Sequence, residues 1–168
     1  MVLTKHELIA SLQDEVRILL HLASKVDRSA LDYRPTPKQR STGELLCYLS
    51  MMGPALVQAA TAGAFDSAAW AAAEQAASAR TFDEALAAIA AQPAAYAALL
   101  ADVTDDDLRA EVDPFGTGRT SRGAFLVTQA LCACAAYRTQ LFLYLKACGR
   151  EELNTWNLWA GIDQPAAP

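Results

Sequence analysis

SRGAFLVTQALCACAAYRTQLFLYLKACG, residues 121–149, is the stretch that decides the fold. At roughly 100° of rotation per residue, it predicts one long helix with an apolar stripe centred on Tyr137, and with Gly149 as its C-terminal cap. Cys134 and Gln140 lie at the edges of this stripe, and Cys132 lies on the opposite face. We expect any pocket of the protein to be built against the stripe. Its other members are Leu126, Ala130, Ala133, Leu141, Tyr144 and Cys148.

Three capping boxes predict where other helices begin. In each box Ser or Thr stands three residues before Glu, so that each side chain can accept a hydrogen bond from the other residue's backbone N–H. The boxes start at Thr4, Ser41 and Thr81. The helix after Thr4 is expected to run to about Val26.

Prolines mark the expected breaks in these helices. Pro35 and Pro37 predict a non-helical connection between the first two helices, because proline removes a backbone donor. Gly53-Pro54 is expected to kink or interrupt the second helix, and Pro93 the third.

The elements together predict an all-α fold, because no long stretch shows the period-two alternation of a β-strand. We expect a single domain over residues 1–168, folded as an antiparallel four-helix bundle. Residues 150–168 are expected to form a tail that packs back on the bundle through Trp156 and Trp159.

The composition is that of a globular protein, with 53% hydrophobic and 20% charged residues among 168. A formal net charge of −5 argues against nucleic acid and anionic membranes as partners, because both bind basic surfaces. No apolar run reaches the roughly 18 residues of a membrane-spanning helix, and the charged first turns do not resemble a secretory signal. Four cysteines without CxxC spacing are typical of free thiols in a cytoplasmic protein.

The order of these parts resembles the DinB/YfiT-like superfamily of four-helix bundles over nearly the whole chain. Residues 137–141, YRTQL, are similar to that family's "H-R-G-Q" segment in the last helix. Residues 44–49, ELLCYL, are similar to its "E-L-L-x-H-L" segment in the second helix. The resemblance implies a divalent metal of the zinc or nickel type, bound by three histidines, one on the second helix and two on the last.

The metal ligands implied by the resemblance are missing here. The three family positions correspond to Tyr48, Ala133 and Tyr137, and an alanine side chain cannot bind a metal. The chain's two histidines, His6 and His21, lie about 22 Å apart along the first helix at about 1.5 Å per residue. His21 is expected on the polar, solvated face, so we expect no metal cofactor.

The phenols at the family's ligand positions are the best candidates for a site. Tyr48 and Tyr137 are expected close together. They either fill the vacated space and hydrogen-bond to each other, to Gln140 or to water, or form a small pocket for a ligand. Cys47 and Cys134 are nucleophile candidates only if a base lowers the pKa of a thiol, and neither helix carries a histidine.

Two functions remain open at this point. The first is a DinB-like protein that has lost its metal and binds a small molecule or a partner. The second is a thiol-dependent transferase or a metal-dependent hydrolase with non-standard ligands. A homodimer is expected because bundles of the family it resembles often pair. Arg138, on the flank of the stripe, is expected to pair with Asp32 or Glu44 rather than to bind an anion.

Overall fold

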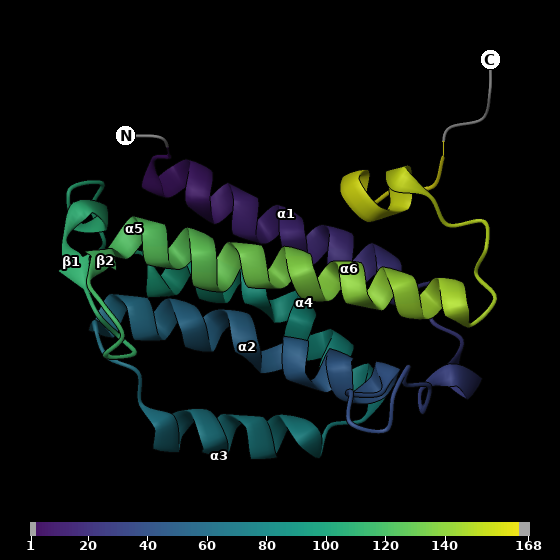
Figure 1. The fold of residues 1–168 in the computed structure, drawn as a ribbon. Coiled ribbons are helices and arrows are strands. Elements are labelled where there is room, and N and C mark those ends of the chain that lie inside the picture. Colours follow the sequence, from purple (N-terminus) through teal and green to yellow (C-terminus); the bar gives the residue numbers. More distant parts are fainter. Residues whose placement is uncertain (1–2, 165–168) are drawn as a thin grey trace.

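The computed structural model describes residues 3–164 and confirms the all-α fold (Figure 1). In this part of the chain the β-structure is confined to one short antiparallel ladder, β1 (Glu111–Val112) with β2 (Thr120–Ser121), just before the last long helix. The α-helices are α1 (Lys5–Ala23), α2 (Thr42–Ala62), α3 (Ser67–Ser78), α4 (Phe82–Leu99), α5 (Arg122–Phe125) and α6 (Cys132–Ala147).

Four helical segments form the bundle: α1, α2, α4 and the continuous α5–α6. Both α4 and α6 pack against α1 and α2, which closes the ring around one apolar core. In Figure 1, α1 and α6 run in one direction and α2 and α4 in the other. This direction of α4 is possible because α3 carries the chain back along the outer side of α2.

The three capping boxes are confirmed as helix starts. Thr4, Ser41 and Thr81 are the N-caps of α1, α2 and α4, and each is paired with the glutamate three residues later. Helix α1 ends at Ala23, slightly before the expected Val26.

The non-helical connection at Pro35 and Pro37 is confirmed, whereas the expected interruptions at Gly53-Pro54 and Pro93 are wrong. Helix α2 continues through Gly53-Pro54, and α4 continues through Pro93. A buried polar contact between the two helices supports α2 at this point. The Gln92 amide of α4 donates to the Leu49 carbonyl at 2.7 Å. Tertiary packing thus overrides the local effect of proline.

The last long helix differs from the uniform α-helix that the sequence predicts. A π-helical segment, η3 (Leu126–Leu131), joins α5 to α6. A π-helical turn contains one more residue than an α-helical turn. It therefore rotates the residues that follow it about the helix axis. As a result Arg138 is fully buried, while Tyr137, the expected centre of the stripe, is only half-buried.

The tail lies against α1 and α6 as expected, and the Trp159 ring contacts the Arg138 guanidinium, but both tryptophans remain largely exposed. Leu153 and Asn157 are buried, whereas the exposed fractions of Trp156 and Trp159 are 45% and 65%. His21 was expected to be solvated, but it lies beneath the tail, with Nε2 3.1 Å from Asn157 Nδ2. Burial lowers the pKa of His21, and the nearby Lys25 ammonium adds to the effect. The end of the predicted tail, residues 165–168, lies outside the described residues.

Helix α2 also corrects the expectation that no stretch is apolar enough to cross a membrane. Its length and composition pass that test, with a mean hydropathy of 1.4 over an 18-residue window. However, 67% of that window is buried inside the bundle. The apolar character of α2 is therefore that of a helix in the core of a folded domain.

Candidate functional site

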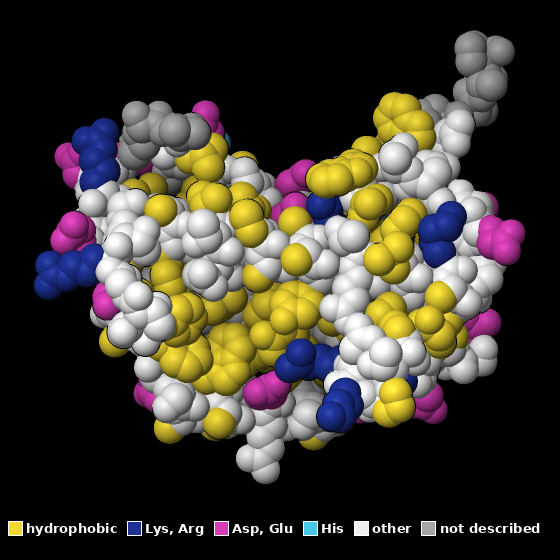
Figure 2. All heavy atoms as spheres, in the orientation of Figure 1, with side chains coloured by type: hydrophobic (Ala, Val, Ile, Leu, Met, Phe, Trp, Pro, Cys, Tyr) yellow, Lys and Arg dark blue, Asp and Glu magenta, His cyan; other side chains and the backbone are white. Residues whose placement is uncertain are grey.

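A cavity of about 330 Å³ opens between α2, α3 and α6, and we call it the aromatic cavity. Figure 2 shows it as an apolar hollow in the face that α6 and α2 present. Among its nine lining residues no side chain is charged, and five are aromatic. The lining consists of Tyr48, Met52, Leu56, Phe65, Trp70, Phe115, Gln129, Ala133 and Tyr137.

The aromatic rings form a connected wall. The Tyr48 ring contacts Tyr137 of α6 edge-to-face, with 5.3 Å between centroids, and Trp70 of α3 at 6.2 Å. Trp70 in turn contacts Phe65 at 5.3 Å, and Phe65 contacts Phe115 at 5.1 Å. These distances and tilts are those of favourable aromatic pairs, so the wall is held by its own packing.

Two loops close one end of the aromatic cavity. The loop after α2 carries Phe65, and the loop between β1 and β2 carries Phe115. The Phe65 backbone N–H donates to the Pro114 carbonyl at 2.9 Å, which holds the loops together. Gly63 allows the first loop to leave α2, because its φ of 71° lies in the left-handed region that favours glycine.

Tyr48 is a neutral hydrogen-bond donor in this site. Burial raises the pKa of Tyr48 far above its usual value, and the neighbouring Tyr137 phenol raises it further. An ionised phenol would lose hydration here, and the nearby Arg40 guanidinium offsets that loss only in part. The phenol is therefore suited to donating a hydrogen bond and unsuited to acting as a base or anionic ligand.

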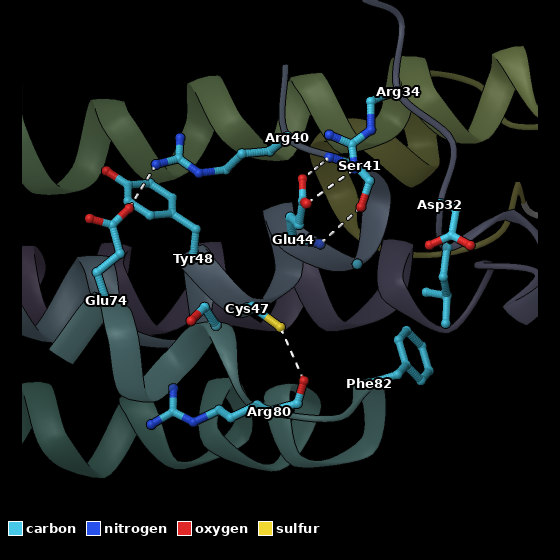
Figure 3. Close-up of a pocket in the computed structure, with 13 residues that line it drawn as sticks. Asp32, Arg34, Arg40, Ser41, Glu44, Cys47, Tyr48, Glu74, Arg80 and Phe82 are labelled. Atoms are coloured by element: carbon cyan, nitrogen blue, oxygen red, sulfur yellow. Dashed lines mark hydrogen bonds and ion pairs between the residues drawn. The ribbon is translucent and has the colours of Figure 1, made fainter. Parts of the chain in front are cut away.

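A second cavity, of about 470 Å³, adjoins the first, and we call it the charged cavity. Tyr48 lines both cavities (Figure 3). The Arg40 guanidinium carbon lies 3.8 Å from the Tyr48 ring centroid, and Arg40 also pairs with Glu74 of α3 at 3.0 Å. The other polar or ionisable residues of its lining are Asp32, Arg34, Ser41, Glu44, Cys47, Ser78 and Arg80.

The cysteines named from the sequence lie apart from each other. The Cys47 thiol lines the charged cavity and donates to the Arg80 carbonyl, with 3.4 Å between sulfur and oxygen. Cys134 does not line the aromatic cavity and lies beside the Tyr96 phenol of α4. Burial raises the pKa of the Cys47 thiol and raises that of Cys134 to about 12. Both thiols are therefore protonated at neutral pH and are weak nucleophiles.

Arg138 forms a structural ion pair as expected, but not with the expected carboxylates, and Gln140 is not the alternative that partners the two phenols. Gln140 donates to the Tyr144 hydroxyl instead of reaching the Tyr48–Tyr137 pair. Arg138 pairs with Glu15 of α1, with 3.2 Å between Nε and Oε2, and not with Asp32 or Glu44. The rotation introduced by the π segment η3 points Arg138 toward α1, while Glu44 pairs with Arg34.

Sequence reasoning missed most of the aromatic wall. Trp70 lies in an alanine-rich helix whose packing the periodicity left unclear, and Phe65 and Phe115 lie in loops. One signal was available. Three aromatic residues outside any predicted apolar stripe indicate a further apolar surface against which they pack. Arg40 and Glu74 of the charged cavity carried no signal, because neither belongs to a motif.

Comparison with known proteins identifies the type of bundle. Neither a protein-family model nor a curated protein matches the sequence. The crystal structure of YjoA, a DinB-like protein from Bacillus subtilis, is similar to this chain with a TM-score of 0.67 at 18% sequence identity. The match covers 89% of this chain and 96% of that one.

The helices and their packing place the chain in the broad class of all-α helical bundles. Within that class its fold is DinB-like, as the sequence resemblance predicted.

The residues at the three implied ligand positions do not fit a divalent metal. Tyr48, Ala133 and Tyr137 all line the aromatic cavity, but they offer two phenols and a methyl group. Tyr48 is held in its neutral form, and the remaining lining supplies one amide and a thioether. Zinc and nickel sites use imidazole, thiolate or carboxylate donors. Within residues 3–164, no three His, Cys, Asp or Glu side chains are grouped closely enough to bind an ion.

Proposed function

We propose that this protein binds a small organic molecule in the aromatic cavity, at the place where the DinB-like family holds its metal. The ligand is largely apolar and carries a planar ring. A DinB-like bundle of this kind has lost its divalent-metal site and uses the same space for a different purpose.

One observation carries the proposal: the three implied ligand positions line a single cavity whose walls are aromatic rings. A cavity of about 330 Å³ lies at the small end of the range for ligand sites. Five rings offer faces and edges for stacking, and the Tyr48 and Tyr137 hydroxyl groups supply polar contacts that orient a ligand. If the rings served packing alone, they would be expected to close the space rather than line it.

Calorimetric titration with a neutral two-ring probe, 2-naphthamide, tests the proposal. We expect one molecule to bind per chain. Ala133→Phe fills the cavity and should weaken binding at least 20-fold. Ala136→Phe makes the same change on the exposed face of α6 and should leave the affinity within twofold.

Two results would contradict the proposal. One is the absence of heat from binding of 2-naphthamide to the wild-type protein at millimolar concentration. The other is equal weakening by Ala133→Phe and Ala136→Phe. Metal analysis of the same preparation completes the test, because a stoichiometric ion that Tyr137→Phe removes would favour a metal-dependent hydrolase.

The protein's own cysteines do not favour the alternative of a transferase. Cys47 and Cys134 have raised pKa values, and neither α2 nor α6 carries a histidine. A reaction that uses an added low-molecular-weight thiol would need a place for that thiol beside the aromatic cavity. A thermal shift with glutathione or another such thiol would support this alternative.

The proposal includes a homodimer in the cytoplasm. Support for the dimer comes from large apolar side chains that remain exposed on α6 and the tail: Leu143 (58%), Trp156 (45%), Trp159 (65%) and Ile162 (42%). Four cysteines without disulfide bonds support a reducing compartment. A small-molecule role requires neither nucleic acid nor membrane.

A further inference from the structure

We infer that the ligand of the aromatic cavity is a carboxylate, and that its acidic group binds in the adjoining charged cavity, to Arg40 and Arg80. This inference rests on the proposed function and specifies the chemical class of its ligand: an arene or similar apolar ring that carries an anionic group. The ring lies among Tyr48, Trp70 and Tyr137.

The two cavities adjoin along the same pair of helices. On α3, Trp70 lines the aromatic cavity, and Glu74, one turn later, lines the charged cavity. Four residues span about 6 Å along a helix, so the two sites are a short distance apart. On α2, Tyr48 belongs to both linings. A ligand with a ring and one short polar group is long enough to reach both.

Arg40 stands at the boundary between the cavities. In Figure 3 its guanidinium extends across the Tyr48 ring toward Glu74. It makes one hydrogen bond to Glu74, at 3.0 Å, and no other from its side chain within residues 3–164. A guanidinium offers five donors in a plane, enough for a carboxylate to bind through two of them. Arg40 can therefore accept an acidic group in addition to Glu74 or in its place.

Arg80 adds a second positive charge on the same side. Its Nη1 donates to the Ser50 hydroxyl, and no carboxylate of the described residues pairs with it. Figure 3 shows Arg40, Glu74 and Arg80 around Tyr48 and Cys47, with Asp32 and Phe82 at the other end of the view. The lining has three residues of each charge, and Arg80 is the one cation among them that pairs with no carboxylate of the described residues.

Exchange of Glu74 for a ligand carboxylate requires little rearrangement. The Arg40 and Glu74 side chains are 39% and 42% exposed, and such partly solvated pairs contribute little to stability. Arg34, by contrast, donates to both Glu44 and the Gln39 carbonyl. Glu44 also caps α2 through the Ser41 N–H at 2.7 Å. The Arg34–Glu44 pair therefore stabilises the start of α2 and is less suited than Arg40 to exchange its partner for a ligand.

Three probes of the same size and different charge test the inference by calorimetry: 2-naphthoate, 2-naphthamide and 2-naphthylmethylamine. We expect the wild-type protein to bind naphthoate at least tenfold more tightly than the amide, and the amine most weakly. Arg40→Met keeps the length of the side chain but removes its charge. It should reduce the naphthoate affinity to within threefold of the amide affinity and leave the amide unchanged.

Arg80→Met provides a second, independent variant with the same expected direction. Arg109→Met, which removes an exposed arginine remote from both cavities, should leave all three affinities unchanged. Circular dichroism and thermal melting verify that each variant is folded.

The outcomes separate this inference from the proposed function. If the amide binds as tightly as naphthoate, or if the amine binds most tightly, the carboxylate inference is wrong. The proposed binding of a ligand in the aromatic cavity is then unaffected. The inference is also wrong if Arg40→Met and Arg80→Met weaken the amide and naphthoate equally. If none of the three probes binds, the proposed function fails as well.

Discussion

Tyr48 is the residue that the aromatic cavity and the charged cavity share. Its ring forms part of the aromatic wall on one side and lies against the Arg40 guanidinium on the other. A histidine at this position would serve a metal, whereas a buried, neutral phenol serves a ligand that stacks and accepts a hydrogen bond. The residues at positions 48, 133 and 137 together determine the chemistry that this place in the bundle can support.

Gly53 of α2 allows the close contact between α2 and α4. A Cβ atom at this position would lie 2.1 Å from the Tyr96 hydroxyl oxygen, which donates to Gln92 Oε1 at 3.0 Å. Gly53→Ala should therefore lower the free energy of unfolding by about 1–3 kcal/mol, measured by urea denaturation, because the overpacked helices must separate.

A double-mutant cycle shows whether that clash is the cause. Tyr96→Phe removes the hydroxyl group and costs about 1 kcal/mol by itself. Combined with Gly53→Ala, it should give less destabilisation than the two single changes added together. Strictly additive effects would mean that Gly53 is required for another reason.

At the residue scale the sequence predicted that Tyr48 and Tyr137 lie close together, but not which residues surround them. The structure places Tyr48 and Tyr137 in contact, as the family resemblance implied. The contact between Phe65 and Phe115 could not be predicted, because it depends on two loops that meet across 50 residues of chain. The ion pair that Arg138 forms depends on how α6 is rotated about its axis, and the spacing of apolar residues does not determine that rotation.

At the scale of the helices, the contact between α1 and α6 contains a buried ion pair. Arg138 is 2% exposed and Glu15 is 15% exposed. Within residues 3–164, Arg138 Nε, Arg138 Nη1 and Glu15 Oε2 make no hydrogen bond, so the 3.2 Å contact is an ion pair without hydrogen-bond geometry. The Trp159 ring lies over the guanidinium at 5.3 Å. The pair is therefore poorly compensated for its burial.

Removing one member of this ion pair should destabilise the protein more than removing both members. Glu15→Ala leaves the Arg138 charge unpaired in the core and should reduce the free energy of unfolding by roughly 3 kcal/mol. The double variant Glu15→Leu with Arg138→Met should recover most of that loss in urea denaturation. A double variant as unstable as Glu15→Ala would show that the pair is needed for packing or orientation.

The start of α4 should make stability depend on pH in the acid range. The Thr81 backbone N–H, and next the Thr81 hydroxyl, hold the pKa of the Glu84 carboxyl below its usual value. A carboxyl with a lowered pKa in the folded state stabilises the protein above its unfolded pKa of about 4.3, and that contribution is lost as pH falls through the folded pKa.

Glu84→Gln isolates this effect, because glutamine still accepts the capping hydrogen bonds but does not titrate. Between pH 5 and pH 3, the variant should lose less unfolding free energy than the wild-type protein. Parallel curves for the wild-type protein and Glu84→Gln would contradict the prediction.

Helix starts were predictable from the sequence, and helix interiors were less so. A capping box acts within four residues, so Thr4, Ser41 and Thr81 could be identified without knowledge of the fold. The continuity of α2 through Pro54 depends on packing against α4, and the π segment η3 gives no periodic signal.

At the scale of the whole molecule, the order of the helices and their closure around one core followed from hydrophobic spacing and the family resemblance. The path of α3 outside the bundle did not, because alanine-rich helices give weak directional patterns. That path matters for function, since α3 brings Trp70 to one cavity and Glu74 to the other.

The proposed homodimer makes a prediction of its own. Light scattering at micromolar concentration should give twice the mass of one chain. Leu143→Lys with Trp156→Lys places two charges among the exposed apolar residues and should shift the mass to that of a monomer. Ala71→Lys, on the exposed face of α3, should leave the dimer intact. A monomeric wild-type protein would refute the dimer.

The central claim is that an aromatic ligand lies where the family's metal would lie. A crystal structure of the wild-type protein with 6-bromo-2-naphthoate tests this most directly, because anomalous scattering locates both the bromine atom and any bound transition metal. We expect a bromine signal within the aromatic cavity, between Tyr48, Trp70 and Tyr137, with the carboxylate toward Arg40. A metal signal between Tyr48 and Tyr137, or a bromine signal found solely outside that cavity, would contradict it.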